Sequence, residues 1–270
     1  MTATDQPRLD HDLRCASWES DSAAACDCRD DSGHSPIVCW ADGRMLGWDL
    51  ETTGQDPRQA RIVTATVVDI RPGKKPIITN WLSDVDGEEI PEGAAEIHGV
   101  TTEDARKNGR PLADVVNELI GALDFAAESS VPNVGHNIGT YDHLVLACEA
   151  RRFDLKPHDT GLIVDTIVLD RAMNRRYGKG AHTLTSACAA YSLTLSEEDA
   201  HSSAADALFA ARLAWKIAHR FPLVGHMPLR ALQEWQAAEH RKFADNLGRY
   251  FKRVGKPDDV VREWPARAGA

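Results

Sequence analysis

The most informative stretch of this 270-residue chain reads Gly47-Trp48-Asp49-Leu50-Glu51-Thr52-Thr53-Gly54. Apolar residues precede it and Thr-Thr-Gly ends it, which predicts a short β-strand that runs into a loop. Asp49 and Glu51 are two residues apart, and alternate residues of a strand point to the same face. Two adjacent carboxylates repel each other, and a bound cation that prefers oxygen ligands, Mg²⁺ or Mn²⁺, relieves the repulsion. The alternative interpretation is a solvated strand end that carries two surface acids.

The overall composition is typical of a globular protein. Hydrophobic residues make up 43% of the chain and charged residues 27%. The length of 270 residues suits one larger domain or one domain with an appendage. The apolar runs are far shorter than a membrane span, and the polar N-terminus lacks the apolar region of a signal peptide. We therefore expect a cytoplasmic protein with no membrane contact. The net charge of −10 argues against non-specific coating of nucleic acid, but not against an enzyme that holds a few nucleotides through metal ions.

Residues 1–38 are predicted to form a flexible or loosely folded leader, because they are rich in Asp, Ser and Ala and show little hydrophobic periodicity. Four of the six cysteines lie in or directly after it, at Cys15, Cys26, Cys28 and Cys39. A Zn²⁺ site is one interpretation of these cysteines. Unligated thiols in a mobile segment are the favoured interpretation, because the usual Cys-x2–4-Cys spacing is absent.

Residues 39–222 are predicted to form one α/β domain, and residues 223–270 a C-terminal helical extension. Three strands with short links, which indicate an antiparallel meander, are expected at 44–50, 61–70 and 76–82. Two more strands, at 131–136 and 161–165, alternate with helices. The main helices are expected at 92–109 (broken at Gly99), 111–127, 141–153, 166–173, 183–191, 206–220 and 227–254, the last as one long helix or a broken pair. This order predicts a mixed five-stranded sheet flanked by helices, in which ligands gather near the strand ends.

Two later segments carry further candidate site residues. Asp142 follows the strand at 131–136 through a short loop, so it is predicted to lie in the first turn of the next helix. His201 and Asp206 are five residues apart, which on a continuous helix would rotate their side chains about 140° apart. We therefore expect His201 in the preceding loop and Asp206 in the opening turn of the helix, from where both can reach one point.

Together these motifs resemble those of the DEDDh (DnaQ-like) 3′–5′ exonuclease family, which has an RNase H-like fold. The motifs are Asp-Leu-Glu-Thr-Thr-Gly at 49–54, His-Asn-Ile-Gly-Thr-Tyr-Asp at 136–142 and His-x4-Asp at 201–206. The histidine of the third motif marks the "h" branch. Segments 97–101 and 182–188 look like two further family segments. The resemblance covers about residues 44–220. One spacing, from residue 137 to residue 142, is one residue longer than in some members, which points to a different subfamily.

The resemblance implies an enzyme that hydrolyses DNA phosphodiesters from the 3′ end and releases nucleoside monophosphates. It implies that two Mg²⁺ or Mn²⁺ ions are bound by Asp49, Glu51, Asp142 and Asp206. It also implies that His201 is the general base that takes a proton from the attacking water, a role suited by a free pKa of about 6.5.

Four residues are expected to contact substrate or to order the site. Backbone groups of Thr52 and Thr53 would hold the terminal 3′-OH, His98 would flank the terminal base, and Asn137 would order the loop before the third acid. Plain packing or turn roles are the alternative for each of them.

Three other features have simpler interpretations. Asp165 is expected to cap a helix that starts at Thr166, and Trp48 is expected to face the core by strand alternation. The basic segment 171–179 either steers a phosphate backbone or is a solvated loop.

The expected partner is nucleic acid with a free 3′ end, with single-stranded DNA favoured and a DNA polymerase as a second partner. An exoribonuclease of the same fold is the alternative within the class. A non-catalytic module that binds nucleic acid or a polymerase is an alternative from another class, and the intact set of four acids and a histidine counts against it. A zinc-dependent binding protein centred on the N-terminal cysteines is the third alternative.

Overall fold

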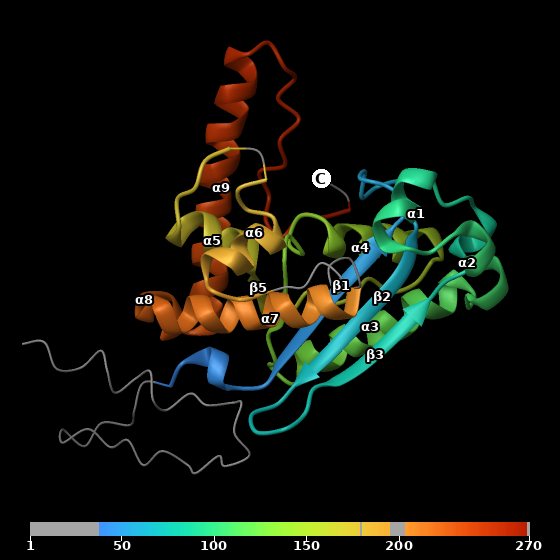
Figure 1. The fold of residues 1–270 in the computed structure, drawn as a ribbon, viewed down its shortest axis with the longest axis horizontal. Helices are drawn as coiled ribbons and strands as arrows, with labels where there is room; N and C mark the ends of the chain where they lie inside the picture. The colour runs from blue at the N-terminus through green and yellow to red at the C-terminus, as the bar shows by residue number, and fades with distance from the viewer. Residues whose placement is uncertain (1–37, 179, 195–202, 269–270) are drawn as a thin grey trace, which may run out of the picture.

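The computed structural model describes residues 38–178, 180–194 and 203–268. Its centre is a five-stranded sheet with the strand order β3-β2-β1-β4-β5 (Figure 1). The strands β1 (Met45–Thr52), β2 (Ile62–Ile70) and β3 (Ile77–Leu82) form the expected antiparallel meander. The short strands β4 (Asn133–Gly135) and β5 (Ile163–Asp165) extend the sheet in parallel with β1. The mixed five-stranded sheet predicted from the sequence is therefore confirmed.

The helices lie close to their predicted ranges, because their start and stop signals are local. Thr101 caps α2 in a reciprocal bond pattern with Asp104, and Gly99 ends α1 in the left-handed region with φ 75°. The α-helices are α1 (Glu92–His98), α2 (Thr102–Asn108), α3 (Leu112–Glu128), α4 (Asp142–Arg152), α5 (Thr166–Met173), α6 (Leu184–Ala190), α7 (Ser203–Arg220), α8 (Pro222–Gly225) and α9 (Leu229–Arg253). Two 3-10 turns complete the set, η1 (Trp40–Asp42) and η2 (Val85–Gly87).

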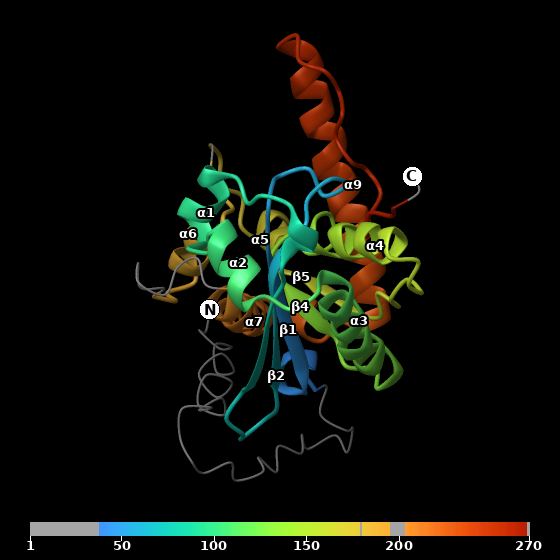
Figure 2. The same ribbon diagram turned by 90° about the vertical axis from the view of Figure 1, so that its right-hand side faces the viewer.

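Helices cover both faces of the sheet (Figure 2). On one face, α3 and α4 pack on β1 around Trp48, which is fully buried as predicted. On the other face, α7 lies across the sheet together with α5 and α6. At Gly47 the backbone of α7 approaches β1 so closely that an added Cβ would lie 2.8 Å from the carbonyl oxygen of Ala207. The absence of a side chain at Gly47 therefore lets the first turns of α7 pack directly on β1.

The C-terminal helical extension begins with α8 and α9, and α9 projects well beyond the sheet (Figure 1). Its first turns nevertheless belong to the core. Gln236 is fully buried, and its amide accepts from the N–H of Asp165 and donates to the carbonyl of Ile163. After α9 the chain returns to the body, where Trp264 is only 7% exposed. The extension is thus fastened to the sheet at two points.

The leader predicted over residues 1–38 lies outside the described residues except for Val38. Within the described ranges, no helix combines the length and the apolar character that crossing a membrane requires.

Candidate active site

Three carboxylates meet where β1 ends. Oxygen atoms of Asp49, Glu51 and Asp206 all lie within 4.8 Å of one another, and the three side chains are partly exposed. The first two share a face of β1, as strand alternation predicted. Asp206 lies in the first turn of α7, also as predicted. The structure therefore brings together side chains that are about 155 residues apart in sequence.

The fourth predicted acid adjoins this group. Asp142 is the first residue of α4 and is 4% exposed. Its Oδ1 accepts a hydrogen bond of 3.2 Å from the backbone N–H of Leu50, which lies between the two acids of β1. A buried carboxylate is thus fixed against the strand that carries Asp49 and Glu51.

Burial and mutual repulsion raise the pKa values of Asp49, Glu51 and Asp142. The pKa of Asp49 is raised well above its usual value by burial, and the neighbouring Asp142, Glu51 and Asp206 raise it further. Burial raises the pKa of Glu51 to about 7, with a contribution from Asp206. Burial, more than its acidic neighbours, raises the pKa of Asp142 to about 8. A cluster of oxygen donors that resists ionisation is the donor set that a hard divalent cation fits, because the cation compensates the charges.

The loop that leads to Asp142 is fixed by a single buried carboxylate. Asp165 accepts from the N–H of Asn137 at 2.8 Å and from the N–H of Gly139 at 2.9 Å. It also accepts from the N–H of Ile167, which confirms that it caps α5. Asn137 has a positive φ of 74°, and its side-chain oxygen accepts from Thr140 Oγ1 at 2.7 Å. Sequence reasoning found the cap but not the two bonds to the loop.

The C-terminal tail closes over the same loop. The N–H of Ala266 donates to the carbonyl of Gly139 at 2.8 Å, and Trp264 Nε1 approaches Asp165 Oδ2 at 3.4 Å. A Cβ at Gly139 would lie only 2.0 Å from Trp264 Nε1. The tail therefore contributes to the shape of the site, and the sequence holds no signal for this beyond a tryptophan near the C-terminus.

The exonuclease family matches residues 46–214, which is more than half of the chain and includes all four acids. This chain belongs to the exonuclease family. The DnaQ-like 3′–5′ exonuclease resemblance inferred from the motifs is therefore confirmed at the level of the family.

Individual relatives agree with this assignment. Ribonuclease T of Hahella chejuensis (strain KCTC 2396) is 28% identical over 190 residues, which are 66% of this chain and 84% of the relative. The solved structure of E. coli exonuclease I in complex with a dT13 oligonucleotide shares the fold, with a TM-score of 0.53 and 20% identity over 67% of this chain. A moderately thermophilic exonuclease I from Methylocaldum szegediense gives a TM-score of 0.57 and 19% identity over 74% of this chain. This chain spans 42% and 46% of the length of those two solved chains.

In this exonuclease domain, the two threonines after β1 have local bonding partners. Thr52 Oγ1 lies 2.5 Å from Tyr141 Oη, which links the end of β1 to the loop before α4. The N–H of Thr53 donates to the carbonyl of Arg61, and Thr53 Oγ1 accepts from the N–H of Arg61 at 2.9 Å. These bonds fix the connection to β2. A contact of the Thr52 and Thr53 backbones with substrate stays a prediction.

Of the two histidines predicted for the site, the structure describes His98 but not His201. His98 ends α1, and its Nδ1 accepts from the N–H of Val100 at 3.2 Å. The neutral ring therefore carries its proton on Nε2, which is buried and has no hydrogen-bond partner among the described residues. Its pKa is lowered by burial, which favours the neutral form. His201 lies outside the described residues.

The basic segment 171–179 is partly neutralised within the exonuclease domain. Arg176 forms two bonds, of 3.0 and 2.6 Å, with the fully buried Asp170, which also accepts from His182 at 2.6 Å. The guanidinium carbon of Arg171 lies 3.9 Å from the ring centroid of Phe243 in α9. A role of this segment in steering phosphate stays a prediction.

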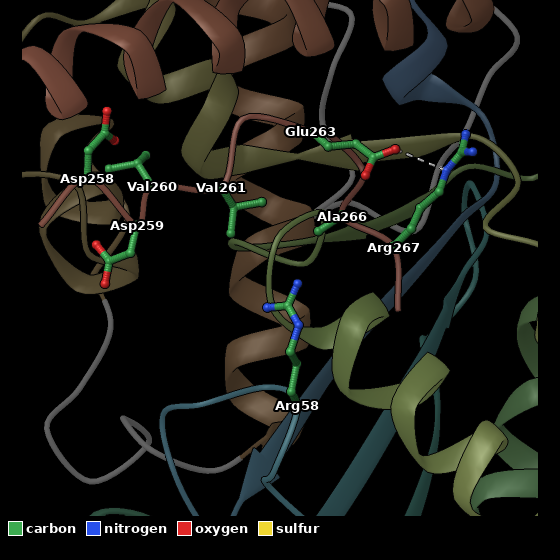
Figure 3. Close-up of a pocket in the computed structure, with 8 residues that line it drawn as sticks. All are labelled: Arg58, Asp258, Asp259, Val260, Val261, Glu263, Ala266 and Arg267. Carbon is green, nitrogen blue, oxygen red and sulfur yellow. Dashed lines mark ion pairs between the residues drawn. The ribbon is translucent and has the colours of Figure 1, made fainter. Parts of the chain in front are cut away.

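Beside the tail lies an open hollow of about 340 Å³ (Figure 3). Arg58, from the loop between β1 and β2, points toward Val261 of the tail, and Glu263 pairs with Arg267 at 3.4 Å. None of the four acids lines this hollow. The candidate active site is therefore the open carboxylate cluster at the end of β1 and not the hollow.

Proposed function

We propose that this exonuclease-family protein is a divalent-metal-dependent 3′–5′ exonuclease that removes nucleoside monophosphates from single-stranded DNA. The observation that carries the proposal is the meeting of Asp49, Glu51 and Asp206 within 4.8 Å, with the buried Asp142 against the same strand. Retaining four such acids in one place is costly for folding unless cations bind them. The arrangement therefore serves a bound metal rather than stability.

In this proposal Asp49, Glu51, Asp142 and Asp206 hold two Mg²⁺ or Mn²⁺ ions. When bound, such ions supply positive charge at the phosphodiester and lower the pKa of a bound water. His201 accepts the proton of the attacking water, a role that rests on its place in the third motif. Asp165 acts through the loop, because its bonds to residues 137 and 139 set where Asp142 begins α4.

His98 is proposed to meet the terminal nucleotide. This role rests on the place of His98 in the family-like segment 97–101, because its Nε2–H is itself buried and has no hydrogen-bond partner among the described residues. Asn137 is proposed to act indirectly, because both its backbone and its side chain are bonded within the loop.

The choice between DNA and RNA has support on both sides. The exonuclease I structures of similar fold hold oligodeoxynucleotides, such as dT13, and we favour single-stranded DNA. The relative named ribonuclease T supports RNA as the second candidate. A polymerase partner and a cytoplasmic location stay predictions from the sequence.

The test uses matched DNA and RNA oligonucleotides that carry the label at either the 5′ or the 3′ end. We expect a ladder of shortening 5′-labelled DNA with added Mg²⁺ or Mn²⁺, immediate release of a 3′ label as mononucleotide, and no reaction in EDTA. Asp49→Asn and Asp206→Asn should each lower the rate by more than about a hundredfold. Asp114→Asn, at an exposed acid of α3, is the matched control and should leave the rate unchanged. Full activity in either site variant, or release from the 5′ end, would refute the proposal.

A further inference from the structure

A second group of metal-binding side chains lies at the opposite end of β1. The Sγ of Cys39, a carboxylate oxygen of Asp42 and a ring nitrogen of His219 all lie within 4.8 Å of one another. Asp42 ends the turn η1 that precedes β1, whereas His219 lies in the last turn of α7. Since a strand rises about 3.3 Å per residue, this group is about 20 Å from the acids that end β1. It is a separate site.

The hydrogen bonds of His219 direct a lone pair toward Asp42. Nδ1 lies 2.9 Å from the carbonyl oxygen of Trp215, and a carbonyl can only accept, so Nδ1 is the donor. In the neutral ring, the lone pair is therefore on Nε2, which lies 3.0 Å from Asp42 Oδ1. The lone pair of Nε2 and the carboxylate oxygen of Asp42 repel each other at 3.0 Å unless a proton or a metal ion is bound between or beside them. A backbone carbonyl on the second ring nitrogen is the usual support of a metal-binding histidine.

The carboxylate and the thiol are also held in place. Trp215 Nε1 donates to Asp42 Oδ1 at 3.3 Å. Cys39 is 7% exposed, and the backbone N–H groups of Ala41 and Asp42 donate to its sulfur, which stabilises a thiolate. A Cβ at Gly225 would lie 3.2 Å from this Sγ and 2.3 Å from the carbonyl oxygen of Ala218, so the glycine leaves room for the sulfur.

Without a metal, the thiol keeps its proton. Burial raises the pKa of Cys39 to about 11, despite the N–H groups that favour the thiolate. A soft cation can displace that proton, because a thiolate bound to a metal is stable well below its free pKa.

We propose that Cys39, Asp42 and His219 bind a Zn²⁺ ion that fastens the chain before β1 to the end of α7. A set with one sulfur, one nitrogen and one oxygen suits Zn²⁺ rather than Mg²⁺, which takes oxygen ligands. Three protein ligands leave one position of a tetrahedral site for water or a further donor. Binding releases to solvent the proton of the thiol and any proton held between His219 and Asp42. Of the four cysteines considered from the sequence as zinc ligands, the proposed site uses Cys39, together with two residues that were not named as ligands from the sequence. The other three cysteines lie outside the described residues.

Cobalt distinguishes this site from the carboxylate cluster, because only a thiolate ligand gives Co²⁺ an intense charge-transfer band in the near ultraviolet. The full chain is stripped with EDTA, transferred into excess Mg²⁺ to occupy the acids, and titrated with Co²⁺ and then with Zn²⁺. We expect the band to grow to one Co²⁺ per chain and Zn²⁺ to abolish it. The melting temperature should rise on addition of Zn²⁺, and metal analysis should find one Zn²⁺ per chain.

Variants assign the ligands. Cys39→Ser should abolish the band, Asp42→Asn and His219→Gln should weaken Co²⁺ binding at least about tenfold, and circular dichroism checks that each variant folds. Cys188→Ser, at a buried cysteine of α6, is the matched control and should keep the band. The double variant Asp49→Asn/Asp206→Asn should also keep it, which makes the result independent of the proposed function. No band in the unaltered chain, or a band that survives Cys39→Ser and is lost in Cys26→Ser/Cys28→Ser, would overturn the proposal.

Discussion

The contact between the C-terminal tail and the loop before α4 can be tested by adding one methyl group. Gly139 does not have a positive φ, so alanine is compatible with its backbone. The new Cβ would however lie 2.0 Å from Nε1, 2.5 Å from Cε2 and 2.8 Å from Cδ1 of Trp264. Real Cβ atoms essentially never approach other atoms so closely, so either the indole or the loop must move.

The expected magnitudes follow from this geometry. Overpacking by one methyl group costs about 1–3 kcal/mol of the free energy of unfolding. Replacing the 7%-exposed Trp264 by alanine leaves a cavity and costs about 3–5 kcal/mol. In the double variant Gly139→Ala/Trp264→Ala, the methyl group enters space that the indole has left. The double variant should therefore be no less stable than Trp264→Ala alone. The coupling free energy between the two substitutions is then about 1–3 kcal/mol, the cost that Gly139→Ala carries only when the indole is present.

The assay combines denaturant unfolding with the rate of oligonucleotide shortening at saturating Mg²⁺. Gly139→Ala should lower kcat at least about tenfold, because a displacement of the loop moves Asp142 and catalytic geometry tolerates little error. Gly121→Ala is the matched control, since a Cβ at that exposed helical position meets nothing within 4 Å. This control should gain about 0.5–1 kcal/mol of stability and keep its rate. Additive stabilities in the double variant would show that tail and loop are not coupled. An unchanged rate in Gly139→Ala would refute the inference that a displacement at Gly139 reaches Asp142.

Three further outcomes are expected. The pKa of Glu51 is raised from 4.5 to about 7 in the folded chain, so the folded chain holds this proton more tightly than the unfolded chain does. The contribution of Glu51 to the free energy of unfolding is therefore fully present below pH 4.5 and is lost as the pH rises through 7. In EDTA at pH 8, Glu51→Gln should therefore raise stability by on the order of 2 kcal/mol, whereas at pH 4 scanning fluorimetry should show no gain. His98→Ala should raise KM about fivefold and leave kcat within about twofold, because it removes a ground-state contact; a loss in kcat alone would contradict this role. Asp170→Asn should cost about 2–4 kcal/mol in urea unfolding, since it removes the buried negative charge and replaces one of the two oxygens that accept from Arg176 and His182 by an NH₂ donor. A cost below about 0.5 kcal/mol would mean that solvent replaces the acceptor.

Much of the fold could be predicted from the sequence because its signals are short-range. The capping pattern at Thr101, the left-handed glycine at residue 99 and the cap by Asp165 each depend on neighbours within four residues. Strand alternation likewise fixed that Asp49 and Glu51 share a face of β1. The motif order then placed the four acids in one family-like set.

Contacts between distant segments were decided only by the tertiary structure. No local pattern predicts that Ala266 bonds Gly139, or that Cys39 lies beside His219, 180 residues later. The same holds for Asp165, whose carboxylate caps α5 and also accepts a hydrogen bond from the N–H of Gly139, 26 residues earlier. The sequence by itself predicted the four acids as metal ligands and the elements that carry them, but it did not predict the group of Cys39, Asp42 and His219. Where those elements pack was decided by burial of the shared core, which depends on the whole chain at once.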